Sequence, residues 1–391
     1  MMRLRLMAKL LLAAVLLVTL PACWDYREIH KLNYSVTIGV DYQQDEFVLY
    51  VQSLNFNSIA KQEGGRLPET IPSLIGISRG PSLGQAIFDL YRSEQFRMYW
   101  GHLTGLIFSK TALEHVGLID LTDLFNRYRE IRYNIWLYGT EEPIDKLMTA
   151  HNFFNLSVYD SLMLHPQDTY RQYSYMKPIY TYRALSDLFE RGTTMTIPNL
   201  TLTDSHWREG EKKTRELVID GGYFFRNRHY IGHLTGKQLS GAPFMNKKMN
   251  RALLRLDKDG KPTAGFVMIS PKYAIKHRLV GDKVVYDLDY RIDTYMEEML
   301  DNAAEHELKK ALERKLQEQI RYTFEQGRSI HADVFNLNEH LHRHHYKQWK
   351  RIFGDGDLRR DNFELGEINA HVLIRYSGKY KAKIAEKEEP T

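Results

Sequence analysis

The chain has 391 residues, of which 43% are hydrophobic and 26% charged, and its formal net charge is +5. This composition is typical of a globular protein with apolar material for more than one buried core, so we expect two or three domains. The small net charge argues against nucleic-acid binding, because domains of that class carry a concentrated basic surface.

The first 22 residues have the pattern of a secretory signal peptide. Arg3, Arg5 and Lys9 precede an apolar run over residues 10–20, and no acidic residue occurs before Asp25. A helix that spans a bilayer needs roughly 20 apolar residues, so this run is too short to be a transmembrane helix. We predict that residues 1–22 are removed on export, which takes away three positive charges and leaves a net charge of +2.

The end of this segment resembles a lipobox, the cleavage site of bacterial lipoproteins. Leu20, Pro21 and Ala22 precede Cys23, the sole cysteine of the chain, although Pro21 departs from the small or β-branched residue usual there. Two acyl chains hold a protein stably at a membrane. We therefore expect Cys23 to carry a diacylglyceryl group and palmitate, anchoring the protein to the outer face of the cell membrane. The alternative is a plain secretory signal followed by an incidental cysteine.

Strands and helices alternate irregularly in the first half of the mature chain. The patterns predict strands at 34–40 and 47–56 joined by a turn at 43–45, a loop at 58–72, a helix at 82–92, a strand at 103–108, a helix at 118–128 and a strand at 133–139. Residues 151–182 are rich in Tyr, Asn and Gln and show no clear period. This order favours an α+β fold of mixed sheets with packed helices over a doubly wound parallel sheet.

The second half begins after a polar segment without periodicity. We place a linker, or the start of a middle domain, at 198–215, which divides an N-terminal domain (23–197) from a C-terminal domain (216–378) with two possible subdomains (216–264 and 265–378). Strands are expected at 216–225, 230–234, 265–269, 284–292 and 368–376, with a hairpin turn at 257–260 and a charged tail at 379–391.

The longest predicted element is an amphipathic helix over residues 296–325. Its apolar positions recur mostly at intervals of four: Leu300, Leu308, Leu312, Leu316, Ile320 and Phe324. This spacing predicts a helix roughly 40 Å long that packs against the sheet of its own domain. A coiled-coil partner is the alternative, but the spacing lacks a heptad repeat.

One segment matches the G-x-S-x-G pattern of serine hydrolases. Gly80, Ser82 and Gly84 follow a strand-like run at 74–77 and lead into the helix expected at 82–92. A hydrolase would need an acid and a histidine from elsewhere, and the chain offers so many of both that the match is weak evidence. The simpler interpretation is that the Ser82 hydroxyl caps the helix.

Clustered histidines and acidic turns are the candidate metal ligands. His340 and His344 would share a helix face, but no third protein ligand is identifiable, so we expect a solvated or partner-facing surface and no metal. The acidic residues near Asp45 and Asp259 do not complete a calcium loop and are better explained as turn residues. No cofactor-binding motif is present.

The mature chain would begin Cys23-Trp24-Asp25-Tyr26-Arg27-Glu28-Ile29. This start resembles that of the Ger(x)C family, the lipoprotein C subunits of spore germinant receptors. The resemblance is strongest in the Cys-Trp-Asp start and covers nearly the whole mature chain. Its landmarks in the first half are Trp24, Asp25, Glu28, Gly39, Asp41, Gly101, His102, Arg129 and Arg132; those in the second half are residues 220–223, 333–335 and Trp349. Asn336 and Asn338 stand where the family pattern would have glycines, and Asn tolerates a left-handed backbone better than most residues.

The resemblance implies a non-enzymatic subunit that takes part in nutrient-triggered germination. It implies partners in the membrane, namely an A-type and a transporter-like B-type integral subunit, and a position at the outer surface of the inner spore membrane. Two alternatives stay open: a membrane-anchored serine hydrolase using Ser82, and a solute-binding lipoprotein with a nutrient pocket between its domains.

Overall fold

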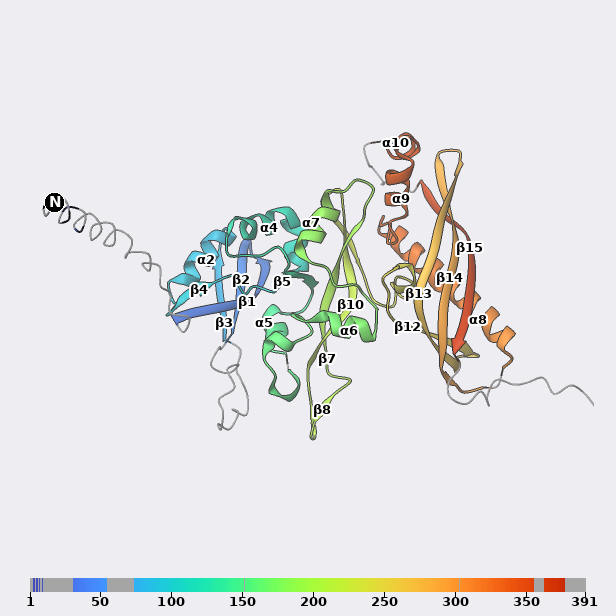
Figure 1. Cartoon of the computed structure of the whole chain (residues 1–391), viewed down its shortest axis with the longest axis horizontal. Coiled ribbons are helices and arrows are strands. Elements are labelled where there is room, and N and C mark those ends of the chain that lie inside the picture. The colour runs from blue at the N-terminus through green and yellow to red at the C-terminus, as the bar shows by residue number, and fades with distance from the viewer. Residues whose placement is uncertain are drawn as a thin grey trace, which may run out of the picture.

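The computed structural model describes residues 31–54, 74–150, 152–301, 303–354 and 362–376, together with Arg3, Arg5, Met7 and Lys9. The described chain forms two large sheets that follow one another along the long axis of the molecule, each with its own helices, and a small two-stranded sheet (Figure 1). The mixture of parallel and antiparallel strands with packed helices confirms the expected α+β class. The predicted leader, the loop at 58–72 and the tail at 379–391 lie outside the described residues, apart from the four positions before residue 10.

The first sheet has nine strands, in the order β11-β10-β7-β6-β5-β1-β2-β3, with β4 paired to β1. In chain order they are β1 (Leu32–Gln43), β2 (Glu46–Leu54), β3 (Leu74–Gly80), β4 (Arg97–Tyr99), β5 (Gly105–Ser109), β6 (Trp136–Thr140), β7 (Met195–Thr203), β10 (Glu216–Arg226) and β11 (His229–Leu234). β1, β4, β5, β6 and β7 are parallel where they pair, while β2, β3, β10 and β11 join as antiparallel hairpins or meanders. Parallel neighbours are possible because helices connect them.

Helices cover both faces of this sheet because its central strands are apolar on both sides. In β5, Leu106 and Phe108 face one core and Ile107 faces the other. One face carries α2 (Leu83–Tyr91), α3 (Lys110–His115), α4 (Leu118–Arg127) and α7 (Thr181–Phe189); the other carries α5 (Ile144–Met148) and the turns around residues 158–164. The strands and helices expected between residues 34 and 139 are present with shifted ends.

The sheet continues across the linker predicted at 198–215. β7 extends to Thr203 and pairs with β10, so that Thr203 lies opposite Glu216. Between them, β8 (Arg208–Glu209) and β9 (Lys212–Lys213) form a small hairpin. The predicted strands at 216–225 and 230–234 therefore belong to the first sheet, and the division of the chain into domains at this segment stays a prediction.

The second sheet has four strands in the order β12-β13-β14-β15. They are β12 (Ala252–Lys258), β13 (Lys261–Val280), β14 (Lys283–Met299) and β15 (Phe363–Tyr376). The turn between β12 and β13 has Asp259 and Gly260 at positive φ, as the hairpin predicted at 257–260 requires. β13 and β14 form a long antiparallel ribbon, visible as the tall arrows at the C-terminal end of Figure 1.

The long helix α8 (Glu305–Ser329) packs against this second sheet. Leu308, Leu312, Leu316, Ile320 and Phe324 are buried in one core with apolar residues of all four strands, which confirms the expected packing within its own domain. Two shorter helices, α9 (Leu337–His344) and α10 (Tyr346–Phe353), close the end of the core.

The predicted start of this helix at residue 296 is wrong. Met296 and Met299 belong to β14, where they pair with Phe266 and Ala264, and Leu300 is 59% exposed. Alternating residues of β14 face the core, and pairing with β13 continues to Met299. The helical spacing that included Leu300 is therefore coincidental, because tertiary strand pairing overrides the local pattern.

The two parts are joined by hydrogen bonds and by a small apolar cluster. The side-chain oxygen of Asn336 accepts from the backbone N–H of Thr194 at 2.7 Å, and the Thr323 hydroxyl donates to the Gln238 carbonyl at 2.9 Å. Phe224, Leu234, Leu239 and Ala332 form a shared core at this junction. Asn336 has φ 53°, so asparagine supplies the left-handed backbone that the sequence led us to expect there.

Candidate functional site

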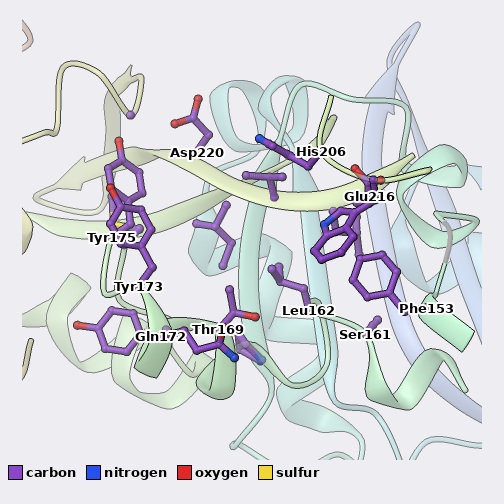
Figure 2. Close-up of a pocket in the computed structure, with 18 of the residues that line it drawn as sticks. Phe153, Ser161, Leu162, Thr169, Gln172, Tyr173, Tyr175, His206, Glu216 and Asp220 are labelled. Carbon is purple, nitrogen blue, oxygen red and sulfur yellow. The ribbon is translucent and has the colours of Figure 1, made fainter. Parts of the chain in front are cut away.

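A cavity lies beside the first sheet, between β10 and the segment 152–176. We call it the Glu216 pocket. Its volume is about 830 Å³, and its walls are made by strand β10, by α6 (Pro166–Gln172), by residues 206–207 before β8, and by residues 236–240 after β11. Figure 2 shows Glu216 and Phe153 at one end of it, and Asp220, Tyr173 and Tyr175 at the other.

A buried carboxylate and two aromatic rings form the first end of this pocket. Glu216 is 6% exposed; one of its oxygens accepts from the Thr214 hydroxyl, and the other has no hydrogen-bond partner among the described residues. The rings of Phe153 and Trp207 meet edge to face with centroids 5.0 Å apart. The backbone carbonyl of Trp207 accepts from Thr214 at 3.2 Å, which ties the indole and the carboxylate to the same hairpin.

The second end brings a carboxylate and a phenol together over a glycine. A Cβ atom at Gly236 would lie 1.8 Å from an oxygen of Asp220 and 2.1 Å from the hydroxyl of Tyr175, so a larger residue there would displace both groups. Burial, followed by the negative charge of Asp220, raises the pKa of Tyr175 well above its usual value. This phenol stays protonated and able to donate a hydrogen bond at physiological pH.

A second, smaller hollow gathers three of the sequence landmarks. Gly101, His102 and Arg132 line a cavity of about 380 Å³ at the edge of the sheet where β5 and β6 begin. Burial, and then the positive charge of Arg132, lowers the pKa of His102. The His102 ring also lies edge-on to Tyr34 of β1, with ring centroids 5.1 Å apart.

The remaining landmarks are distributed along the sheet. Arg129 is exposed and lines a third hollow, next to Glu130, whose carboxylate accepts from the backbone N–H of Trp100. Asp41 lies near the end of β1 and accepts from the Thr111 hydroxyl at 2.6 Å, which fixes the start of α3. Gly39 lies under α5, where a Cβ atom would come within 2.3 Å of Ile144. The landmarks thus do not converge on one site.

Ser82 is a helix cap, as the simpler interpretation of its motif predicted. Its hydroxyl accepts from the backbone N–H of Gln85 at 3.3 Å, and its backbone is extended, as at an N-cap. The other hydrogen bond found for this hydroxyl within the described chain goes to the Gln85 side chain. No histidine or acid contacts the hydroxyl in that part of the chain, so the geometry lacks the base that a serine nucleophile needs.

The histidine cluster spans two elements of the second sheet's domain. His340 and His344 on α9 have ring centroids 4.6 Å apart, and His345 lies 4.4 Å from His277 of β13. The Nε2 atom of His277 donates to the side-chain oxygen of Gln348 at 2.7 Å. Over the described ranges, no group of three or more His, Cys, Asp or Glu side chains has an arrangement that would hold a metal ion.

The predicted lipidation segment lies outside the described residues. This applies to Leu20, Pro21, Ala22 and Cys23, and equally to the landmarks Trp24, Asp25 and Glu28. Among the residues that the structure does describe, no helix has both the length and the apolar character needed to cross a membrane.

Sequence reasoning missed the Glu216 pocket. Its walls come from segments spread over residues 152 to 240, and part of them lies in the stretch 151–182 that shows no period. The available signal was the unusual density of tyrosine, tryptophan and phenylalanine around a few carboxylates. Composition does not show that these residues lie together, because their proximity depends on the pairing of β7 with β10.

Comparison with known proteins gives a consistent result for both halves of the chain. Residues 25–202 match the family model of the spore germination protein N-terminal domain, and residues 220–378 match the model described as spore germination B3/GerAC like, C-terminal. Spore germination protein KC of Bacillus subtilis is 22% identical, with 97% of each chain covered. Spore germination protein YndF of the same organism is 20% identical, with 96% of this chain and 97% of that protein covered.

The fold agrees with a solved structure. A crystal structure of the GerBC protein superposes with a TM-score of 0.50 at 13% sequence identity, covering 86% of this chain and 96% of that one. The two family models together extend over nearly all of the chain beyond its first 24 residues, in the order that the family has them. The chain therefore belongs to the Ger(x)C family of spore germination proteins.

Proposed function

We propose that this protein is a non-enzymatic, lipid-anchored subunit of a spore germinant receptor. It acts in nutrient-triggered germination by contacting integral membrane subunits, an A-type and a transporter-like B-type protein, at the outer surface of the inner spore membrane. The observation that carries the proposal is the match of two consecutive family models, over residues 25–202 and 220–378, in one chain.

The absence of catalysis is supported by the surroundings of the hydrolase-like motif. The Ser82 hydroxyl is engaged as the cap of α2, and Gly80 approaches the backbone of α2 so closely that a Cβ atom there would lie 2.8 Å from the Ala86 nitrogen. These residues have a structural explanation. The glycine-serine-glycine pattern therefore gives no reason to expect a hydrolase.

Lipidation of Cys23 is the feature on which the proposed location depends. Diacylation confines a protein to the membrane plane and raises its local concentration beside membrane-embedded partners. Leu32, the first residue of β1, follows Cys23 by nine positions, so the anchored sulfur and the first sheet are at most about 30 Å apart. The N-terminal half would then lie close to the membrane-embedded subunits.

Exchange of the cysteine tests this proposal. The Cys23→Ala variant should fold normally but leave the membrane fraction of spores, and germination in response to the cognate nutrient should be lost or strongly delayed. Pro21→Ala is the matched control, because it changes the same segment toward the usual lipobox and should keep both membrane retention and germination. Full membrane retention and normal germination of Cys23→Ala would refute the proposal.

A further inference from the structure

We infer that the Glu216 pocket binds a small organic cation with a primary amino group, and that Glu216 holds this group beside the rings of Trp207 and Phe153. The inference goes beyond the proposed role as a receptor subunit, because it assigns a ligand class to a cavity of this chain. It rests on one carboxylate, the aromatic walls beside it and the charge of the whole lining.

The carboxylate of Glu216 lacks half of its hydrogen bonding. The side chain is 6% exposed, and within the described chain one oxygen accepts from Thr214 while the other accepts from nothing. Buried polar groups in folded proteins are nearly always hydrogen-bonded, because burial without a partner costs several kcal/mol for a charged group. A ligand ammonium group would supply both the missing donor and the opposite charge.

The walls next to this oxygen suit a cation. Phe153 and Trp207 are 40% and 57% exposed, so these two large apolar side chains present open ring surface at the pocket. Aromatic rings attract cations to their faces, and tryptophan does so most strongly. Trp207 lies in the same hairpin connection as Thr214, the donor to Glu216, so the ring and the carboxylate are held together before any ligand arrives.

Charge and size point to the same class of ligand. The lining contains three carboxylates, Asp160, Glu216 and Asp220, against one lysine, Lys237, and no arginine. This excess of negative charge disfavours anions such as phosphates and dicarboxylates. The volume of about 830 Å³ lies within the range of cavities that take small molecules.

The test uses the full lipidated chain in a non-ionic detergent and measures binding by titration calorimetry. The probe is n-butylammonium, with n-butanol as the neutral molecule of the same length. We expect n-butylammonium to bind and n-butanol to bind at least about tenfold more weakly, since charged hydrogen bonds are the stronger ones. Equal affinity for the two probes, or no detectable binding of n-butylammonium, would overturn the inference.

Two variants identify the site. Glu216→Gln keeps the shape of the side chain and should weaken binding of n-butylammonium about tenfold, whereas Glu211→Gln, an exposed position in the same hairpin, should leave it unchanged. Trp207→Leu changes an exposed ring, cannot disturb the core, and should also weaken binding. Unchanged affinity in both Glu216→Gln and Trp207→Leu would sink the assignment. Binding by the purified chain and germination of spores are separate measurements, so either can fail without the other.

Discussion

At the scale of single residues, the family landmark Asp333 is a buried carboxyl group that binds backbone N–H groups at the start of α9. Its side chain is fully buried and accepts the backbone N–H of Asn338 at 2.6 Å, just before α9. Burial raises the pKa of Asp333 to about 6, and the backbone N–H groups that donate to it offset this only in part. The folded protein therefore holds a proton on this carboxyl more tightly than the unfolded chain does.

This pKa predicts a specific dependence of stability on pH. A carboxyl whose pKa rises from 3.8 to about 6 on folding stabilises the fold below pH 3.8, and that stabilisation is lost as the pH rises through about 6. The wild-type chain should therefore lose about 2 kcal/mol relative to Asp333→Asn between pH 4 and pH 7, as an order of magnitude. Urea unfolding at several pH values measures this difference in the free energy of unfolding. Asp282→Asn, at an exposed position, is the control. Parallel pH profiles for wild type and Asp333→Asn would contradict the prediction.

At the scale of elements, local patterns predicted most strands and helices, and tertiary pairing decided the rest. The turn at 43–45, the cap at Ser82 and the hairpin at 257–260 follow from residue types that favour those conformations, and the structure contains all three. The start of α8 was predicted wrongly because Leu300 fits a helical spacing by chance. Whether residues 296–299 form a strand depends on β13, which no local window contains.

The candidate pocket could not be predicted for the same reason. Glu216 looks in sequence like any glutamate at the start of a strand. Its position follows from the pairing of β10 with β7 and from the hairpin that connects Trp207 to Thr214, the donor to Glu216. The segment 151–182 contributes short turns and α6 with little periodicity, so its position depends on the sheet that it covers.

The packing of α5 on β1 gives a prediction at this scale. A Cβ atom at Gly39 would lie 2.3 Å from the Ile144 side chain, so Gly39→Ala must push the helix away and should lower the free energy of unfolding by about 1–3 kcal/mol. Gly84→Ala is the control: its Cβ atom meets nothing nearer than 4.0 Å, and alanine within α2 should stabilise by about 0.5–1 kcal/mol. Urea unfolding followed by tryptophan fluorescence distinguishes the two. Equal free energies of unfolding for the two variants would show that α5 can shift away from β1 without loss of stability.

At the scale of the whole molecule, the strand directions in the first sheet determine which side of that sheet lies nearest the predicted lipid anchor. β1, β5 and β6 are parallel, so their N-terminal ends lie on the same side of the sheet. The loops that hold His102 and Arg132 are therefore on the same side as Leu32, where β1 begins. The turn at Asp45 lies at the opposite end of β1, 12 residues or about 36 Å along the strand. The second sheet and α8 follow farther along the molecule (Figure 1).

If Cys23 is lipidated as proposed, this geometry selects the edge that faces the bilayer. The nine positions from Cys23 to Leu32 extend at most about 30 Å, too short to run back along β1 and bring the Asp45 turn to the membrane. A fluorophore on Asn134→Cys, at the Leu32 edge, should therefore be quenched by spin-labelled lipids more strongly than one on Asp45→Cys. Labelling would be specific, because Cys23 is the only native cysteine and its sulfur would carry the lipid. In the Cys23→Ala background both signals should be insensitive to the lipids, and equal or reversed quenching in the anchored protein would show that the tether does not set the orientation.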